Sequence, residues 1–449
     1  MAQAQREFFD RENEAGGYLS ADRVGFFSLL VGSGKTKKQS SHRLTDMPTV
    51  LRLVDKSRDS WLSQAEFMAP NRRVVNLARI GLLFSDLDTY NCEWSQGKSP
   101  DQLAQAVLFG CADAGIPEPS ILIYSGRGIQ AKWLLDGPLP RQALPRWNAC
   151  QKHLVNALRP WGADSAARDA SRVLRLVDTV NTKSGAVCQV IHVNEGADGL
   201  PKRYDFEELC EWILPIARSE LEDAKRAREL RKAALQLVQG SAAVKRLKGF
   251  SGRQLSWDRL EDLRKLATLR GGVAENMKTT TLFWQLNFLL LSGATNSQLM
   301  YHEAAELAKN INPKWSHRAP ELSTLYSKAK AHEAGELVEH GKYKLSPLYT
   351  PKNDTLINIF QITDEEQAQL KTIISPAMAA ARHRARETSR RRAAGAVERA
   401  DYLKAAQDKR QQAIALKEQG LSVRKIALQL SISVGAVSGY LKGVQSPCV

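Results

Sequence analysis

Cysteine is scarce in this sequence, and none of the patterns in which cysteine builds a site is present. Six cysteines are scattered over 449 residues, with no C-x-x-C pair and no histidine at zinc-finger spacing. These absences exclude a zinc-finger protein and a disulfide-stabilised secreted domain. We therefore expect reduced and mostly buried thiols, as in a cytoplasmic protein.

Long hydrophobic runs are also missing. The most apolar stretch, TLFWQLNFLLLSG at 281–293, is too short to span a bilayer and contains Gln285 and Asn287, so we interpret it as a buried helix. The first residues, MAQAQREFFDRENEAGG, lack a basic segment followed by an apolar one, and we do not expect export. The sequence predicts a cytoplasmic protein with no membrane partner.

An intact phosphate-binding loop is absent as well. The stretch LLVGSGKTKK at 29–38 suggests one, because such a loop has glycine, four residues, and then Gly-Lys-Ser/Thr. Counting back from Gly34 and Lys35, the first glycine position is Leu29. We interpret Lys35, Lys37 and Lys38 as a basic loop after a short strand, so that any phosphate chemistry depends on other residues.

Positive charge is what the sequence has in excess. The net charge is +16 and the isoelectric point is near 9.6, which favours an acidic partner, most commonly nucleic acid. The tail, residues 376–449, contains fourteen Lys or Arg and five Asp or Glu, a net charge of +9. One sixth of the chain therefore carries more than half of the excess.

Alternation of strand-like and helix-like segments predicts an α+β fold for the first part of the chain. Within it we expect a strand at 80–88, helices at 100–114 and 141–159, a β-hairpin around Gly126-Arg127-Gly128, and a strand at 186–193. The predicted domains are 1–215 (mixed α/β), 216–250 (charged helical connector), 251–337 (helical), 338–400 (linker and basic segment) and 401–449.

The tail carries a helix-turn-helix pattern. A first helix should run to about Glu418 and end at Gly420, and Ser422 can cap a second helix. Ser431-Ile432-Ser433 would form the turn, although such motifs often have glycine at the position of Ser431. The alternative is a small three-helix bundle that uses its charges only for solubility. The residues expected to contact DNA are Ser422, Arg424, Lys425, Ser433, Gly435, Ser438 and Lys442.

Two acids end the hydrophobic strand in LLFSDLDTY. Asp86 and Asp88 are two residues apart, so their carboxylates project from the same face of the strand. Like charges this close repel unless a cation lies between them, and Mg²⁺ or Mn²⁺ suits hard oxygen ligands. Solvated acids at the end of a strand are the alternative.

Two further stretches supply groups that match a bound triphosphate. YSGRGIQAKWLL at 124–135 offers backbone N–H groups and Arg127 between two strands. GADSAARDASRVLRLVDTVNTKSG at 162–185 offers an acid to complete a metal pair and cations to neutralise phosphates, which are the parts that nucleotidyl transfer requires. Its candidate residues are Asp164 or Asp169 as the third acid, with Arg172, Arg175, Asn181 and Lys183.

The order of these pieces resembles the archaeo-eukaryotic primase superfamily, in particular the replication proteins and primases of plasmids and phages. In that family a strand ends in D-x-D, a strand pair carries a small-residue motif, a third acid follows, and R-L-P-G-T-x-N-x-K is common. The corresponding residues here are Asp86 and Asp88, Ser125 to Gln130, Asp164 or its rival Asp169, and Arg175 to Lys183.

The resemblance implies a primase-type mixed α/β catalytic domain that makes primers from nucleoside triphosphates on single-stranded DNA with Mg²⁺ or Mn²⁺. The helical stretch at 275–313 is similar to the domain that often follows such cores. With a duplex-binding tail, this implies a replication initiation protein of a plasmid or phage. No helicase motor is recognisable, so a host or element-encoded helicase and polymerase are expected partners. The basic loop with Lys35, Lys37 and Lys38 could touch template.

Two departures from the family pattern affect the expected site. Gln130 stands where many members have histidine, so the phosphate contact could pass to Arg127 or Lys132. Val177-Asp178 replaces the usual Pro-Gly, which bears on the local turn. Two alternatives therefore remain: a non-catalytic origin-binding initiator or repressor that recruits host enzymes, and a metal-dependent nuclease. The expected nucleotide contacts are Ser125, Arg127, Gln130, Lys132, Arg172, Arg175, Asn181 and Lys183.

Overall fold

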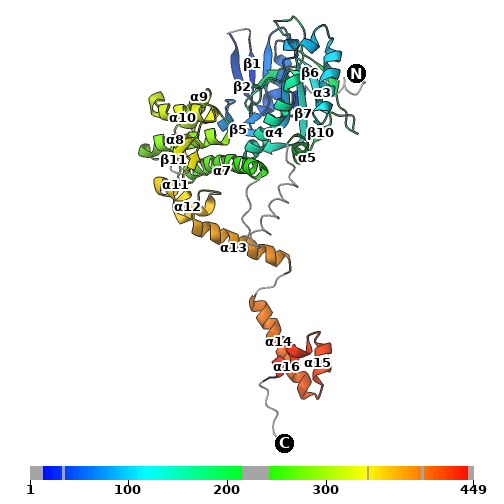
Figure 1. Ribbon diagram of the computed structural model, residues 1–449, viewed down its shortest axis with the longest axis vertical. Coiled ribbons are helices and arrows are strands. Elements are labelled where there is room, and N and C mark those ends of the chain that lie inside the picture. The colour runs from blue at the N-terminus through cyan, green and yellow to red at the C-terminus, as the bar shows by residue number, and fades with distance from the viewer. Residues whose placement is uncertain (1–13, 33–35, 215–241, 341–342, 396–398, 443–449) are drawn as a thin grey trace. The chain divides into compact units, whose positions relative to one another are not determined.

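The computed structural model describes residues 14–32, 36–214, 242–340, 343–395 and 399–442. It contains two compact units, Met1–Ile373 and Ile374–Val449, each of which is described here by itself. The expected mixed α/β and helical regions therefore belong to one unit (Figure 1). Most of the predicted connector at 216–250, together with Gly34 and Lys35 of the basic loop, lies outside the described residues.

A mixed, mostly antiparallel sheet organises the first part of this unit. Its path is β8-β3-β1-β4-β5-β7-β6-β9, with β2 paired to β1 and β10 parallel to β7. The predicted strands and hairpin are present. The bounds are β1 Phe26–Val31, β2 Lys38–Arg43, β3 Ser60–Ser63, β4 Glu66–Phe67, β5 Leu77–Leu87, β6 Ile121–Tyr124, β7 Ile129–Pro140, β8 Val173–Arg175, β9 Gln189–Val193 and β10 Arg203–Tyr204.

The helices of this region follow from local signals in the sequence. Ser99 caps α3 (Pro100–Asp113) in a capping box with Gln102, and proline stands in the first turn of α3 and of α4 (Leu144–Ala157). These helices confirm the predictions at 100–114 and 141–159. The other elements are η1 Glu14–Gly17, η2 Leu44–Asp46, α2 Met47–Leu53, η3 Val74–Asn76, η4 Thr89–Asn91, η5 Glu93–Ser95, η6 Arg141–Ala143, η7 Arg159–Trp161 and α5 Phe206–Ile213.

One edge of β5 is completed by side chains because its neighbour β4 is only two residues long. The Gln151 side chain on α4 accepts from the Phe84 N–H at 3.2 Å and donates to the Phe84 carbonyl at 2.6 Å. Trp147 Nε1 donates to the Leu82 carbonyl at 2.8 Å. These contacts satisfy buried backbone groups that would otherwise lack partners, so α4 fixes the strand that leads to the acids.

A helical region follows within the same unit. Residues 338–375 are not simply a linker, which corrects the sequence prediction. Asp262 on α7 accepts from the N–H groups of Lys371, Thr372 and Ile373 at 2.8, 2.6 and 2.8 Å, so this segment is bound to the helices. The elements are α7 Ala242–Leu269, η8 Glu275–Met277, α8 Lys278–Ser292, α9 Met300–Ile311, η9 Ala319–Leu322, α10 Ser323–Glu333, β11 Val338–His340, β12 Tyr343–Leu345, α11 Asn353–Phe360 and α12 Asp364–Gln369.

Buried acids join the helical region to the start of β5. Glu303 on α9 accepts from the Val74 and Val75 N–H groups at 3.4 and 3.2 Å, and Asn76 Nδ2 donates to Glu306 at 2.9 Å. Because η3 runs directly into β5, these bonds hold the strand at its beginning, while α4 holds its middle.

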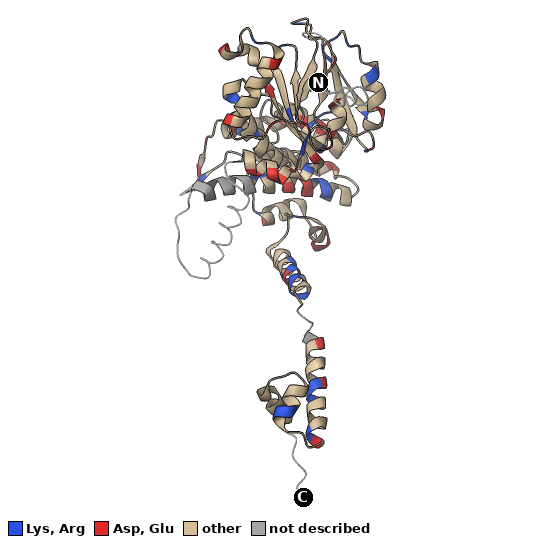
Figure 2. Ribbon diagram, turned by 90° about the vertical axis from the view of Figure 1, so that its right-hand side faces the viewer, with Lys and Arg blue, Asp and Glu red and all other residues tan. Residues whose placement is uncertain are grey.

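The second unit contains α13 (Pro376–Ala393), α14 (Arg399–Glu418), α15 (Val423–Gln429) and α16 (Val434–Leu441). Figure 2 shows Lys and Arg along α13. The last three helices pack around Ala413, Ile426, Ala427 and Val437. Gly420 has a positive φ of 86°, as a left-handed helix end requires. No helix among the described residues has the length and apolar character needed to cross a membrane.

Candidate active site

The two acids of the D-x-D motif lie at the end of β5, against a second segment of backbone. Asp86 pairs with Gln130 across β5 and β7, so their side chains share a face. On the other edge, the Asp164 N–H donates to the Asp86 carbonyl and the Asp88 N–H donates to the Gly162 carbonyl, both at 2.8 Å. Asp86, Asp88 and Asp164, the carboxylate cluster, are thus tied together through the main chain.

Electrostatics distinguish Asp164 from its rival Asp169. Burial, and then the charge of Asp88, raise the pKa of Asp86 to about 7, and Asp164 contributes to the increase. Burial also raises the pKa of Asp88, again with a contribution from Asp164. Asp169 is not among the charges that act on Asp86 or Asp88. Its Oδ1 accepts from the Ser171 N–H and hydroxyl at 3.1 and 2.6 Å, and its Oδ2 lies 3.4 Å from Arg172 Nε. The structure therefore groups Asp164, and not Asp169, with the motif.

The donor set suits a hard divalent cation. Repulsion and burial disfavour the charged form of Asp86, and a cation would reverse both effects. Gln130 Oε1 is buried beside Asp86 without a hydrogen-bond partner in the described structure, which adds a neutral oxygen. Within the described residues no three acids, histidines or cysteines form a complete metal-binding group.

A cavity of about 400 Å³ opens over the carboxylates. We call it the acidic pocket. The Arg127 guanidinium lies 3.9 Å from the centre of the Tyr90 ring, and Tyr90 hydrogen-bonds Asp88. Lys183 is exposed at the rim. The lining includes the predicted residues Asp86, Asp88, Ser125, Arg127, Gln130, Arg172, Arg175, Asn181 and Lys183, together with Leu30, Lys37, Asp59, Trp61, Tyr90, Val173 and Leu174.

Glycine allows the β6–β7 turn to approach the acids closely. A Cβ atom on Gly128 would lie 2.4 Å from the Leu87 carbonyl oxygen, and one on Gly126, whose φ is +89°, would lie 2.6 Å from Asn181 Cβ. The Leu87 carbonyl oxygen is backbone and could not move without displacing β5, and at Gly126 the positive φ itself disfavours any side chain. Asn181 Nδ2 donates to the Ser125 carbonyl at 2.9 Å, so Asn181 joins the turn to the loop at 179–185.

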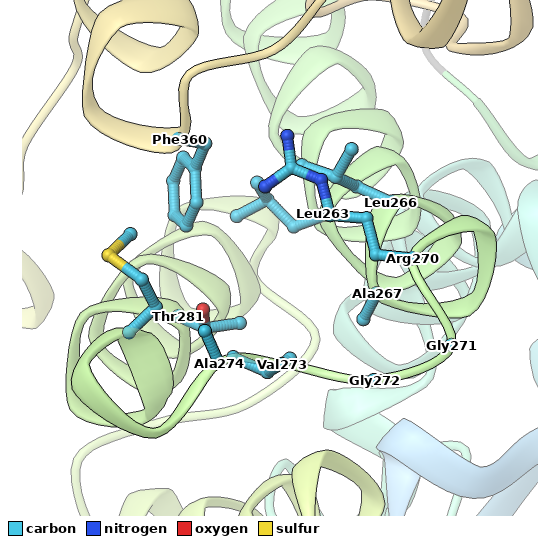
Figure 3. Close-up of a pocket in the computed structure, with 11 residues that line it drawn as sticks. Leu263, Leu266, Ala267, Arg270, Gly271, Gly272, Val273, Ala274, Thr281 and Phe360 are labelled. Carbon is cyan, nitrogen blue, oxygen red and sulfur yellow. The ribbon is translucent and has the colours of Figure 1, made fainter.

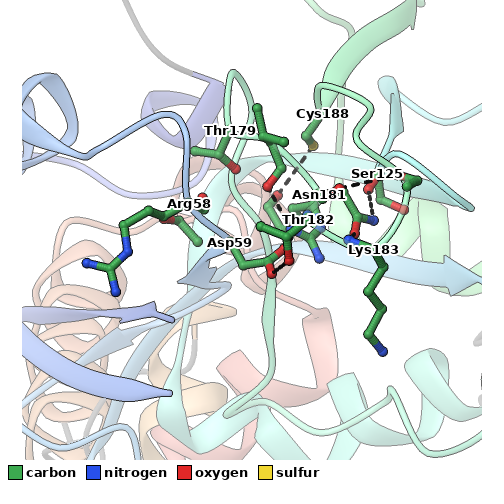
Figure 4. Close-up of polar contacts among 12 residues, drawn as sticks. Arg58, Asp59, Ser125, Thr179, Asn181, Thr182, Lys183 and Cys188 are labelled. Atoms are coloured by element: carbon green, nitrogen blue, oxygen red, sulfur yellow. Dashed lines mark hydrogen bonds and ion pairs between the residues drawn. The ribbon is translucent and has the colours of Figure 1, made fainter. Parts of the chain in front are cut away.

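Asp59 is a pocket residue that sequence reasoning missed. It is buried on the segment before β3, and its Oδ1 accepts from Arg175 Nη1 at 2.5 Å and from the Thr182 N–H at 3.2 Å. Figure 4 shows Asp59 and Thr182 in contact, while the Lys183 side chain extends away. The Arg175 guanidinium also lies 4.8 Å from the Trp61 ring centre. Asp59 belongs to none of the motifs found in the sequence, so no sequence signal pointed to it.

Lys132 was predicted wrongly as a phosphate contact. Its side chain is fully buried, and Nζ donates to both oxygens of Glu14 at 3.0 and 2.9 Å. Side chains two residues apart on a strand lie on the same face, so Lys132 shares the face of Gln130 on β7. Lys132 pairs with Phe84 of β5, two residues before Asp86. Lys132 is therefore on the correct face but deeper in the core, where Glu14 neutralises it.

The tail residues predicted to contact DNA fall into two groups. The Ser422 and Ser433 hydroxyls accept from the N–H groups of Lys425 and Ala436, so both serve as helix caps. Both residues are also exposed, and each hydroxyl keeps its own O–H as a donor. The other five predicted residues are exposed on the α14–α16 bundle: Arg424, Lys425, Gly435, Ser438 and Lys442.

A separate cavity of about 410 Å³ lies where α7 ends and α8 begins (Figure 3). Leu263, Leu266 and Phe360 line it with Met277, and Arg270 is the charged residue at its edge. Arg270 is already bound to Glu366 by hydrogen bonds of 2.6 and 2.7 Å. The cavity holds no acid and lacks the features of a catalytic site.

Comparison with known proteins gives the following similarities. The chain is 29% identical over 309 residues to a replication protein of Clostridium perfringens, covering 69% of this chain and 66% of that protein. No protein-family model matches the sequence. The structure is similar to the primase domain of a cyanophage S-2L primase-polymerase, with a TM-score of 0.32, 19% identity and coverage of 42% of this chain and 89% of that one.

Two further solved structures are of the primase RepB′. One is RepB′ itself, with a TM-score of 0.28, 14% identity and coverage of 70% of this chain and 92% of that one. The other is its catalytic domain in complex with initiator DNA, with a TM-score of 0.28, 14% identity and coverage of 49% of this chain and 97% of that one.

Proposed function

We propose that this chain is a replication initiation protein that synthesises primers on single-stranded DNA. The observation that carries the proposal is the pair Asp86 and Asp88 in the lining of the acidic pocket, which also contains the cations Arg127, Arg172 and Lys183. Asp164 does not line the pocket, but its N–H is bonded to the Asp86 carbonyl. The similarity to a replication protein over 69% of the chain supports it. A strongly positive chain suits a nucleic-acid substrate.

In this proposal Asp86, Asp88 and Asp164 hold two divalent cations, Mg²⁺ or Mn²⁺. When bound, such ions stabilise the attacking and leaving oxygens of phosphoryl displacement. Arg127, Arg172 and Lys183 neutralise the triphosphate of the incoming nucleotide, because they line the pocket and can face it. Asp59 keeps Arg175 in place, so Arg175 is mainly a positioning residue in this mechanism.

The tail would bind duplex DNA at an origin. Exposed Arg424 and Lys425 at the start of α15 suit phosphate contacts, and Ser438 and Lys442 lie on the exposed side of α16. Arginines along α13 would add affinity that does not depend on sequence and that falls with salt.

The decisive test is nucleotide incorporation on unprimed single-stranded circular DNA, with Mg²⁺ or Mn²⁺ and labelled ribo- or deoxyribonucleotides. The wild type should make short products. Asp86→Asn and Asp88→Asn should each lower the rate by at least about a hundredfold, since each removes charge that acts on the transition state. Asp113→Asn is the matched control, because Asp113 is exposed on α3 and does not line the acidic pocket, and it should retain most activity.

Two results would contradict this proposal. Absence of product from folded wild-type protein that still binds duplex DNA would indicate a non-catalytic initiator. Shortening of the DNA template without added nucleotide, dependent on the same acids, would indicate a nuclease.

A further inference from the structure

Three aromatic side chains from three different elements pack against one another at the surface. Trp94 belongs to η5, Phe109 to α3 and Trp161 to η7. The ring centres of Trp94 and Trp161 lie 5.6 Å apart, and those of Phe109 and Trp161 lie 5.8 Å apart, both edge to face. Phe109 is 64% exposed, and the two tryptophans are partly exposed. We call these three residues the aromatic cluster.

A cavity of about 480 Å³ opens at this cluster. Trp94 and Trp161 line it together with alanine and proline side chains, and Asp113 is the charged residue of its lining. Trp94 Nε1 is buried and has no hydrogen-bond partner in the part of the chain that the structure describes. An indole N–H can only donate, so this group requires a ligand with an acceptor atom.

Close packing holds the two tryptophans in place. A Cβ atom on Gly110 of α3 would lie 2.5 Å from the Trp161 ring, so only glycine lets the indole approach the helix this closely. The Ser95 hydroxyl, next to Trp94, donates to two carbonyl oxygens of its own loop at 2.5 and 2.8 Å. The site is therefore formed before any ligand binds, which lowers the entropy cost of binding.

The aromatic cluster is joined through the main chain to the carboxylate cluster. Gly162, which follows Trp161, accepts from the Asp88 N–H at 2.8 Å. The loop that carries Trp94 begins directly after Asp88, and Tyr90 on that loop lines the acidic pocket. We therefore expect one nucleotide strand to reach both the acidic pocket and the aromatic cluster.

The chemistry of the cavity favours a nucleobase. Aromatic side chains stack on the flat faces of bases, and every base has such a face. The carbonyl oxygens and ring nitrogens of a base are acceptors that suit Trp94 Nε1. A phosphate would be repelled by Asp113, whereas a base is uncharged. An aliphatic side chain from a partner protein would leave the Trp94 N–H without an acceptor.

We propose that the aromatic cluster stacks an unpaired base of single-stranded DNA. Phe109 and Trp161 supply the stacking surface, and Trp94 donates a hydrogen bond to the edge of the base. This proposal rests on the proposed function for the identity of the strand, which is the template. Because stacking tolerates any sequence, the site would hold template without selecting where synthesis starts. Duplex DNA would not fit, since the faces of its bases are already covered.

The test is binding of a fluorescent thymidine oligonucleotide by the full chain in EDTA, without nucleotide, over a range of NaCl concentrations. Phe109→Ala and Trp161→Leu should each bind roughly tenfold more weakly, as expected for the loss of one stacked base. The slope of log K against log salt should stay at the wild-type value, because no phosphate contact is removed. Phe109→Tyr, which keeps the ring, should bind like the wild type.

Two controls isolate the contribution of stacking. Trp212→Ala removes an aromatic side chain of α5 that is 67% exposed and lies outside the cluster, and it should bind like the wild type. An oligonucleotide of abasic sites has the same phosphates without bases, so the wild type and Phe109→Ala should bind it equally. Thermal unfolding midpoints check the fold of each variant. Exposed Phe109 carries the test if Trp161→Leu is unstable.

The outcomes separate this proposal from the proposed function. If Phe109→Ala binds the thymidine oligonucleotide as tightly as Trp212→Ala, the cluster does not stack bases, whatever the wild type synthesises. A loss of affinity that is equally large on the abasic oligonucleotide, or a shallower salt slope, would likewise overturn the proposal. If Phe109→Ala loses base-dependent binding although the wild type makes no primers, the stacking site stands and the enzymatic proposal fails.

Discussion

At the scale of single residues, two positions lack the glycine that the motifs they resemble often have. Each has nevertheless kept the left-handed backbone conformation that glycine would adopt. Asp178 has φ of 66° and Ser431 has φ of 51°, both in the left-handed region. Asp178 is held there by its N–H, which donates to the Cys188 carbonyl at 2.8 Å. Both residues therefore differ from glycine in their side chain while the turn keeps its conformation. The left-handed backbone should lower the stability of the fold by about 1 kcal/mol at each position.

Replacing Asp178 by glycine should stabilise the protein by up to about 1 kcal/mol, because the left-handed strain is relieved. The ion pair that Asp178 makes with Lys56, at 3.4 Å, is exposed and contributes little. Urea unfolding followed by tryptophan fluorescence measures the change. Asp178→Val, which cannot adopt this φ easily, should destabilise. An Asp178→Gly protein less stable than the wild type would contradict the interpretation.

Asp59 and Arg175 form a buried pair whose separation should be costly. Asp59→Asn should lower the free energy of unfolding by about 3 kcal/mol, because it leaves the Arg175 charge buried and unpaired. The double variant Asp59→Asn/Arg175→Gln should recover part of that loss, and a double-mutant cycle in urea measures the coupling. Additive effects of the two substitutions would show that the pair is not energetically linked.

At the scale of elements, the site is built where the end of β5 meets two loops. The acids and the glycine turn were predictable because both depend on local patterns: alternation along a strand and a hairpin with small residues. Asp59 and the Lys132–Glu14 pair were not, because each requires a contact between residues more than a hundred positions apart. The choice between Asp164 and Asp169 also required the bridge from Asp164 to β5.

The buried contact between Glu303 of α9 and the N–H groups of η3 should make the stability of the protein depend on pH. Burial raises the pKa of Glu303 to about 7, above its value in an unfolded chain. The folded state then holds a proton that the unfolded state releases, so the stability from this group is present at low pH and is lost as pH rises toward 7. Glu303→Gln, which stays neutral, should gain up to about 3 kcal/mol relative to the wild type between pH 5 and pH 8.

Urea unfolding at several pH values tests this expectation. Exposed Glu336 is the matched control, and Glu336→Gln should follow the wild-type pH profile. A constant difference between Glu303→Gln and the wild type over this range would mean that Glu303 does not titrate there.

At the scale of the whole molecule, the sheet and the helical region depend on each other. Arg141 beside the sheet is buried, and its Nη2 donates to Glu261 of α7 at 2.8 Å and to the Val75 carbonyl at 3.3 Å. Arg264 of α7 donates to that carbonyl at 2.6 Å. Without α7 to α9, Arg141 would keep its buried charge without an acid, and the Val74 and Val75 N–H groups would lose their acceptor.

Truncation should therefore reveal two units and not three. All nine tryptophans lie before residue 374, so tryptophan fluorescence reports on the first unit alone. A fragment of residues 1–373 should unfold at the same urea midpoint as the full chain, because its core and its buried ion pairs are all internal. A fragment of residues 1–214 should unfold at a lower midpoint or fail to fold, since Arg141 and η3 lose their partners. Equal midpoints for all three chains would show that the helical region adds no stability to the sheet.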